Sequence, residues 1–210
     1  MKVFPLCLVC LMYLPRIGTA DYSPRDFLSQ APAETFSTED ELSEVEKQRV
    51  ANSKFIPSTS FTCEAWEIAD ESPTSLTLRI CPDSFVRIQL FHQSSGDTIV
   101  GVESNRSAGR AFDLRFFIVA GRRRKISELN DNQLKALGID EVSENELLSP
   151  SARFPPATAR RVSLSLDEEG RPKATLRSWE DPRWEKRRVA FEPFFEWDGA
   201  RFHKRVKNKR

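Results

Sequence analysis

The sequence predicts an α+β fold built mainly on antiparallel sheet made of hairpins, with one or two short helices between two sets of strands and an N-terminal helix. Two observations lead to this fold class. Apolar side chains alternate with a period of two in several short runs, and most of these runs end at turn-forming residues. In the middle of the chain the apolar spacing changes to that of a helix. The sequence shows no fixed-period repeat, which excludes solenoids and propellers.

The first 20 residues have the pattern of a secretory signal peptide. An apolar run over residues 3–14 follows a lysine, and the small residues Gly18 and Ala20 stand just before Asp21. The run is shorter than the ~20 residues that a bilayer-spanning helix needs. We therefore expect cleavage after Ala20 and an exported protein, periplasmic or extracellular, without a transmembrane span. The alternative is an uncleaved N-terminal anchor.

Charge is distributed unevenly along the rest of the chain. The total is close to neutral, at +1, but residues 21–80 carry a net charge of −7 and residues 151–210 a net charge of +7. We predict an acidic leader over residues 21–58 and a single β-rich α+β domain over residues 59–210. The asymmetry fits either an interaction tail or the docking of the two ends on each other.

The acidic leader contains one predicted helix, which begins near Thr38. Thr38 is a suitable N-cap, and Glu41 stands three residues later, as a capping box requires. Leu42, Val45 and Val50 form a thin apolar stripe on this helix. The preceding residues 21–36 are expected to be loose.

Residues 60–81 are typical of a β-hairpin. In the register that places Trp66 opposite Leu78, Cys63 lies opposite Cys81. These two cysteines are the ones that remain after signal cleavage, and an even count in an exported protein favours a disulfide. The sequence therefore predicts a Cys63–Cys81 disulfide.

Three further elements precede the middle helix. Val86, Ile88 and Leu90 alternate with polar residues and predict a strand, which a turn over residues 93–97 reverses. Residues 111–121 form the strongest predicted strand, with apolar side chains on both faces towards its end. We expect this strand to be central in the sheet.

The middle helix is predicted between Ser127, as its cap, and Gly138, as its stop. Its apolar residues at helical spacing are Ile126, Leu129, Leu134 and Leu137. A short helical turn is expected around residues 143–148.

A C-terminal meander is predicted over residues 160–206. Its first hairpin turns at Gly170 and pairs Leu166 with Ala174 and Leu164 with Leu176.

The last hairpin is predicted to turn on the two residues Asp198 and Gly199. That register sets Glu196 opposite Arg201 and Glu192 opposite Arg205, as structural charge pairs. The basic residues that it leaves uncompensated are Lys204, Lys207, Lys209 and Arg210.

Catalytic chemistry has little support in the sequence. It lacks a Gly-x-Ser-x-Gly elbow, a His-Glu-x-x-His zinc motif and a phosphate-binding glycine loop, so we predict neither a metal nor a cofactor. For His92 and His203, the only histidines, ordinary surface or half-buried roles are expected. Carboxylate acid–base catalysis stays open as an alternative.

These observations favour an exported, non-catalytic interaction domain. Its partner is predicted to be a protein or an anionic envelope component and, because the chain is exported, not nucleic acid. The binding residues are predicted to be Arg122, Arg123, Arg124, Lys125, Lys204, Lys207, Lys209 and Arg210. The rival is a small secreted hydrolase that acts on cell-wall or glycan material through carboxylates.

Overall fold

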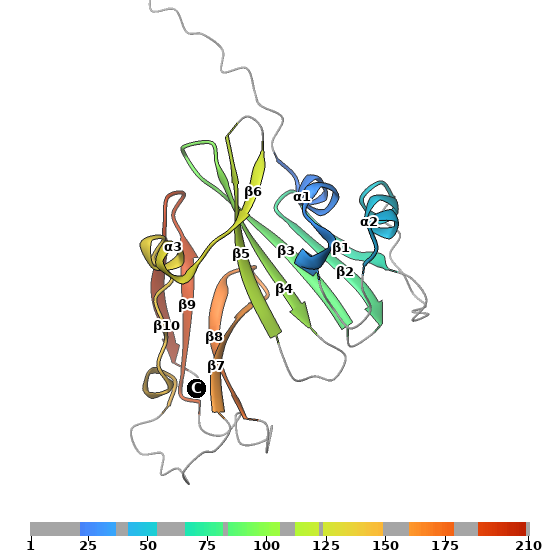
Figure 1. Cartoon of the computed structure of the whole chain (residues 1–210). Coiled ribbons are helices and arrows are strands. Elements are labelled where there is room, and N and C mark those ends of the chain that lie inside the picture. Colours follow the sequence, from blue (N-terminus) through green and yellow to red (C-terminus); the bar gives the residue numbers. More distant parts are fainter. Residues whose placement is uncertain are drawn as a thin grey trace, which may run out of the picture.

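The computed structural model of the 210-residue chain describes residues 22–36, 42–53, 66–81, 84–105, 112–121, 124–148, 160–178 and 189–208 (Figure 1). The signal peptide, Thr38, Cys63, Arg122, Arg123, Lys209 and Arg210 lie outside these ranges.

Ten strands form two antiparallel sheets in the described part of the chain. A six-stranded sheet runs in chain order through β1 Glu67–Glu71, β2 Ser75–Cys81, β3 Ser84–His92, β4 Thr98–Asn105, β5 Phe112–Ala120 and β6 Lys125–Glu128. A four-stranded sheet has the order β10-β9-β8-β7, with β7 Arg160–Leu166, β8 Pro172–Ser178, β9 Phe191–Trp197 and β10 Phe202–Asn208. The predicted α+β class and the dominance of antiparallel sheet are confirmed.

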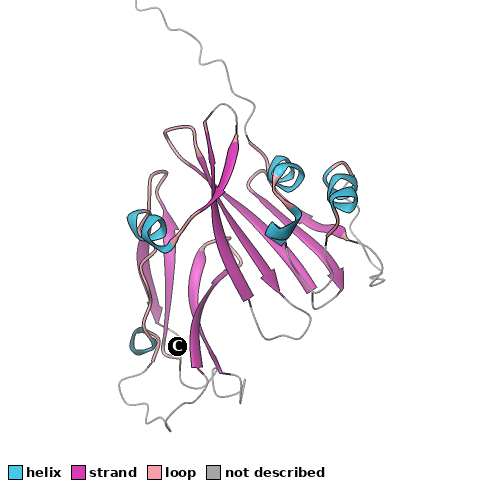
Figure 2. Ribbon diagram, viewed as in Figure 1, coloured by secondary structure: helices cyan, strands magenta, loops and turns pink. Residues whose placement is uncertain are grey.

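Helical segments fall in two places. Before the sheets lie α1 Pro24–Gln30, the 3-10 helix η1 Ala33–Phe36 and α2 Glu44–Ala51; between the two sets of strands lie α3 Asp131–Ala136 and the 3-10 helix η2 Glu144–Glu146. The N-terminal helices cover one face of the six-stranded sheet, and the four-stranded sheet lies on its other side (Figure 2).

This layering creates two hydrophobic cores. The helix-side core lies between the N-terminal helices and the larger sheet, and its sheet residues include Trp66, Ile68, Leu76, Leu78, Val86, Ile88, Val100 and Val102. The inter-sheet core lies between the two sheets and includes Phe91, Ile99, Phe116, Leu176, Phe195 and Phe202. Successive strand residues point to opposite faces, so β5 sends Phe116 into one core and Phe117 into the other.

The expectation of a loose leader over residues 21–36 is wrong. Phe27, Leu28 and Phe36 are fully buried, and the ring of Phe27 lies 5.7 Å from that of Phe117. Few apolar residues suffice here because the six-stranded sheet supplies the opposite apolar surface.

The two N-terminal helices begin at serine capping boxes. Ser23 and Asp26 cap α1, whereas Ser43 and Glu46 cap α2. The second helix therefore begins at Ser43, five residues after the predicted cap Thr38.

Buried and half-buried cations tie these helices together. Lys47, which is only 2% exposed, donates a hydrogen bond to the carbonyl of Ala31. Arg25 binds both carboxylate oxygens of Glu71, at 2.5 and 2.7 Å, and donates to the carbonyls of Ala51 and Ser53. One arginine thus joins α1, the end of α2 and strand β1.

The first hairpin has a different register from the predicted one. Ile68, not Trp66, lies opposite Leu78, and a bulge follows between Ile68 and Asp70. The shift is two residues, so the predicted apolar face is retained. The predicted opposition of Cys63 and Cys81 rested on the other register. Because Cys63 lies outside the described residues, the disulfide stays a prediction.

The next two strands and their turn form as predicted. Val86, Ile88 and Leu90 are buried on one face of β3, and Gly96 adopts a φ of +96° in the turn between β3 and β4. The strongest strand, β5, is not central. It lies next to the short edge strand β6, with β3 and β4 in the middle.

The middle helix is shorter than predicted. Ile126 and Ser127 belong to strand β6, which pairs with the end of β5, and Asn130 caps α3 instead of Ser127. Gly138 does stop the helix, with a φ of +90°. The predicted turn around residues 143–148 is present as η2.

Both hairpins of the four-stranded sheet are shifted from their predicted registers. Leu166 pairs with Pro172 and Leu164 with Ala174. In the last hairpin Trp197 pairs with Phe202, so the turn holds four residues instead of two.

Hydrogen bonds within the turn explain why the β9–β10 turn holds four residues. The Asp198 carboxylate accepts hydrogen bonds from the backbone N–H groups of Ala200 and Arg201, at 2.8 and 2.9 Å. An aspartate that binds the backbone ahead of it stabilises its own turn. This local geometry outweighs the two-residue turn that the Asp-Gly pair favours.

Candidate binding pocket in the four-stranded sheet

The predicted basic face does not form as one surface among the described residues. Arg124 and Lys125 lie at the beginning of β6 in the larger sheet, whereas Lys204 and Lys207 lie on β10 in the smaller sheet (Figure 1). The other four predicted residues lie outside the described ranges.

Two of the predicted binding residues have structural partners. The Arg124 guanidinium lies 5.1 Å from the centre of the Tyr22 ring and 3.9 Å from the Asp26 carboxylate, so it holds the N-terminal segment. Lys204, which was expected to be uncompensated, forms an ion pair with Glu146 of η2. This hydrogen bond with Lys204 lowers the pKa of the Glu146 carboxyl.

The predicted cross-strand charge pairs are also replaced. Glu196 binds Arg205 at 3.0 Å, instead of Arg201. Glu192 lies opposite Lys207, instead of Arg205. The shift of the register by two residues accounts for both exchanges.

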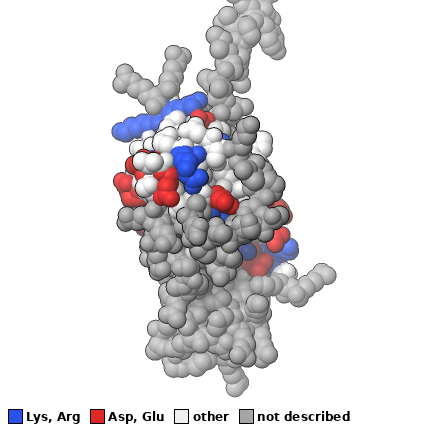
Figure 3. Space-filling view, turned by 90° about the vertical axis from the view of Figure 1, so that its right-hand side faces the viewer, with Lys and Arg blue, Asp and Glu red and all other residues white. Residues whose placement is uncertain are grey.

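The described residues of the acidic leader do not reach this part of the molecule. Of its described acidic residues, Glu44 pairs with Lys47 at 2.6 Å and Glu46 caps its own helix. Both lie on the helix-covered side, where Figure 3 shows charges of both signs beside each other. For the described residues, docking of the leader on the basic strand β10 is thus not observed.

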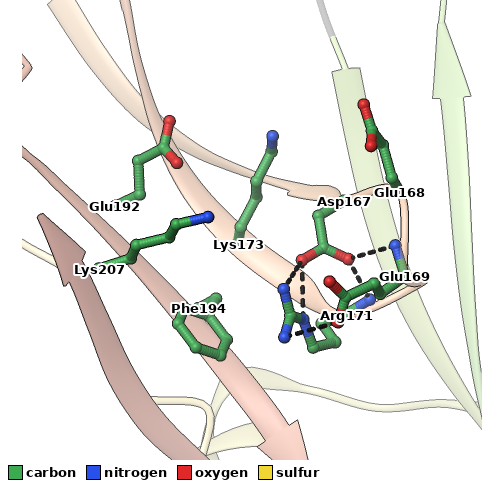
Figure 4. A pocket seen from close by; sticks show the side chains of 8 residues that line it. All are labelled: Asp167, Glu168, Glu169, Arg171, Lys173, Glu192, Phe194 and Lys207. Carbon is green, nitrogen blue, oxygen red and sulfur yellow. Dashed lines mark hydrogen bonds and ion pairs between the residues drawn. The ribbon is translucent and has the colours of Figure 1, made fainter. Parts of the chain in front are cut away.

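A pocket of about 240 Å³ lies where the two hairpins of the smaller sheet meet. Strands β8 and β9 are joined through a register pair between Lys173 and Phe194. The pocket is lined by Asp167, Glu168, Glu169, Arg171, Lys173, Glu192, Phe194 and Lys207 (Figure 4). Its walls therefore come from the β7–β8 turn and from strands β8, β9 and β10.

The β7–β8 turn forms one wall of the pocket. The Asp167 carboxylate accepts hydrogen bonds from the backbone N–H groups of Glu169 and Arg171, and it binds the Arg171 guanidinium at 2.8 Å. Arg171 also binds Glu169 at 2.7 Å and lies 4.4 Å from the centre of the Phe194 ring. Arg171 is therefore fixed between two carboxylates and an aromatic ring.

The larger sheet holds this turn from behind. Arg87 of β3 donates to the carbonyls of Leu166 and Asp167, at 3.2 and 3.0 Å. Gly170, with a φ of +76°, packs so closely on Gln89 that a β-carbon at this position would overlap the Gln89 side chain. The turn is thus attached to the rigid middle of the six-stranded sheet.

The opposite wall carries two lysines that the turn does not neutralise. Within the part of the chain that the structure describes, neither Lys173 nor Lys207 forms a hydrogen bond or an ion pair through its ammonium group. Figure 4 shows both on the side of the pocket where Glu192 lies, away from the Asp167–Arg171 pair. Lys207 was predicted from the sequence, but Lys173 and Arg171 were not.

The histidines have local partners, as ordinary structural histidines do. His92 lies 3.2 Å from the Thr98 hydroxyl, through its Nδ1 atom. His203 lies 2.6 Å from Asp198, through its Nε2 atom. The hydrogen bond from the backbone N–H of Arg201 lowers the pKa of the Asp198 carboxyl, and the hydrogen bond with the His203 side chain contributes less in the same direction.

No three His, Cys, Asp or Glu side chains among the described residues are placed to hold a metal ion together. None of the described helices is long and apolar enough to cross a bilayer.

Comparison with known protein families, with curated proteins and with solved structures gives no significant match. The protein is therefore described by its own structure, as an α+β domain of two sheets with a pocket lined by residues of both charges.

Proposed function

We propose that the chain is an exported, non-catalytic interaction domain that binds a protein or an anionic envelope component through the pocket of the four-stranded sheet. The observation that carries this proposal is that Lys173 and Lys207, with Glu192 beside them, line a hollow and form no ion pair among the described residues. Two ammonium groups that outnumber the neighbouring carboxylate favour an anionic partner. Arg124 and Lys204 are excluded from the binding residues because both have structural partners.

The rival function, carboxylate-catalysed hydrolysis, has weaker support. The pocket does contain carboxylates, but Asp167 and Glu169 are both bound by Arg171. Glycoside hydrolysis needs one carboxylic acid and one carboxylate on either side of the bond that is cleaved. A pocket in which one guanidinium binds two of the carboxylates is better suited to hold a ligand than to transfer protons to it.

The test compares two double variants with the same change in charge. K173Q/K207Q removes both pocket lysines, whereas K135Q/R201Q removes two exposed cations on α3 and in the β9–β10 turn. Binding to the native envelope fraction is measured for both at several salt concentrations. We expect K173Q/K207Q to lose binding and its steep salt dependence, and K135Q/R201Q to keep both. Equal loss in the two variants would overturn the pocket as the binding site.

Export is tested separately. Mass spectrometry of the native mature protein is expected to show an N-terminus at Asp21, and peptide mapping without reductant is expected to recover Cys63 and Cys81 in one linked peptide pair. A cytosolic product that retains residues 1–20 would overturn export, and free thiols in the exported chain would overturn the disulfide.

A further inference from the structure

The two sides of the pocket differ in net charge. The β7–β8 turn carries three carboxylates and one guanidinium, which gives it a net charge of about −2. Lys173, Lys207 and Glu192, from the neighbouring strands, give the other side a net charge of about +1. In Figure 4 the acidic turn lies at the right, and the two lysines lie to its left together with Glu192. A ligand in this pocket therefore meets opposite potentials at its two ends.

This separation disfavours a simple anion. An anion bound by the lysines would also lie near Glu168 and Glu192, whose charges repel it. Glu168 is exposed and, within the described residues, its carboxylate has no hydrogen-bond or ion-pair partner. It is therefore available to accept hydrogen bonds from a ligand, and a cationic donor satisfies it better than a neutral one.

We propose that the pocket binds a small zwitterionic group, with the anionic end on Lys173 and Lys207 and an amine on Glu168. The inference rests on the proposed function and specifies the chemistry of its ligand. The volume of about 240 Å³ supports a small group, because pockets for drug-sized molecules measure roughly 300–1,000 Å³. The group belongs to the class of amino-alkyl phosphates and amino acids, free or attached to a lipid or a polymer.

The experiment uses the full mature chain and three soluble probes: O-phosphoethanolamine, inorganic phosphate and ethanolamine. Backbone amide shifts of Gly170, Lys173 and Phe194 report binding in an NMR titration. We expect phosphoethanolamine to bind at least about tenfold more tightly than either half alone, since each charged end adds one charge-assisted contact. Equal affinity for phosphoethanolamine and inorganic phosphate would overturn the zwitterion while leaving an anion-binding pocket.

Matched variants assign the two ends of the ligand. E168Q is expected to reduce the affinity for phosphoethanolamine to that for phosphate, and to leave phosphate binding at least as strong as in the native chain, because a repelling charge is removed. The control E141Q removes another exposed carboxylate, which lies outside the pocket, and is expected to change the affinity for neither probe. If E168Q and E141Q behave alike, the amine does not bind at Glu168 and the proposed arrangement is wrong.

The source of the group is decided by vesicles. Binding to phosphatidylethanolamine vesicles in addition to soluble phosphoethanolamine supports a lipid headgroup, and binding to the soluble probe alone supports a non-lipid source. A third result separates the two proposals: if no probe binds but K173Q/K207Q still weakens envelope binding, the zwitterion is overturned and the proposed function stands.

Discussion

Among the described residues, the six-stranded sheet is covered on both faces, whereas the four-stranded sheet is covered on one. Helices α1 and α2 cover the outer face of the larger sheet, and the smaller sheet covers its inner face. The outer face of the smaller sheet instead carries charged side chains such as Lys173, Glu192 and Lys207 around the pocket. The larger sheet thus contributes to both hydrophobic cores, whereas the smaller sheet contributes to one and carries the pocket on its other face.

The two sheets are nevertheless connected through a few specific contacts. Arg87 and Gln89, on the inner face of β3, hold the β7–β8 turn. The Trp197 indole donates to the carbonyl of His92 at 3.0 Å, and the rings of Phe91 and Phe202 lie 4.9 Å apart. The pocket is thus positioned by the larger sheet although none of the larger sheet's residues lines it.

The largest expected effect is found by comparing two phenylalanines. Phe27 of α1 packs on the outer face of the larger sheet, and Phe194 of β9 lies on the outer face of the smaller sheet. Phe27 is fully buried against Phe36 and Phe117, so Phe27→Ala should reduce the free energy of unfolding by about 4 kcal/mol. Phe194 is half-buried in the pocket, so Phe194→Ala should cost about 1 kcal/mol through the loss of its contact with Arg171. Urea denaturation of both variants measures the difference. Equal losses would mean that the two outer faces contribute alike.

The second prediction concerns the contact between α3 and β10. A β-carbon on Gly138 would overlap the backbone carbonyl oxygen of Phe202. The φ of +90° at this position would also strain any residue other than glycine. We expect Gly138→Ala to lower the free energy of unfolding by about 3 kcal/mol.

Gly199 provides the control for this substitution. It has a similar φ of +96° but open space around its α-carbon, so Gly199→Ala should cost only about 1 kcal/mol. Thermal or urea unfolding of the two alanine variants separates the steric overlap from the backbone strain. A loss at Gly138 no larger than that at Gly199 would show that α3 moves away from β10 without cost.

Sequence patterns predicted the faces of the strands correctly but not their partners. Each of the three hairpin registers is shifted from its prediction by two residues, and the first is shifted by three beyond its bulge. A shift of two leaves every side chain on its predicted face, because the strand period is two. It does exchange the residue opposite, which is why Glu196 binds Arg205 instead of Arg201. Turn and bulge geometry, such as the Asp198 turn, sets the absolute register, and hydrophobic alternation does not reveal it.

The pocket could be predicted only in part for a similar reason. Lys207 was predicted because the basic residues at the end of the sequence are conspicuous. Lys173, Arg171 and Phe194 join it through the pairing of Lys173 with Phe194, which connects the two hairpins. That connection is a long-range pairing that follows a segment outside the described residues. For residues 21–36 the low apolar content predicted a loose segment, but the segment is packed on the larger sheet. A few apolar residues are enough when a sheet provides the rest of the core.

The third prediction tests the attachment of the N-terminal helices to the larger sheet. Arg25→Met removes the ion pair with Glu71 and the bonds to two carbonyls, at an expected cost of about 2 kcal/mol at neutral pH. The hydrogen bond from Arg25 lowers the pKa of Glu71 below its usual 4.5. A carboxyl with a lowered folded-state pKa stabilises above its unfolded pKa, and this contribution disappears as the pH falls through the folded value.

The difference between the native protein and Arg25→Met should therefore shrink as the pH falls below about 4.5. Glu71→Gln serves as the control, since it removes the titrating group but keeps Arg25. Urea denaturation from pH 7 to pH 3 measures all three proteins. A difference that stays constant over this range would show that only the carbonyl bonds of Arg25 contribute.

The smallest expected effect lies on the outer face of the four-stranded sheet. Glu196 and Arg205 pair at 3.0 Å there, but their side chains are 45% and 60% exposed. Water screens such pairs, so Arg205→Gln should change the free energy of unfolding by less than about 0.5 kcal/mol. Because Arg205 does not line the pocket, envelope binding should also stay unchanged, unlike in K173Q/K207Q. Denaturation and envelope binding of Arg205→Gln measure both quantities. A loss of binding with unchanged stability would extend the binding surface along β10 and show that the basic strand as a whole, and not the pocket, attracts the partner.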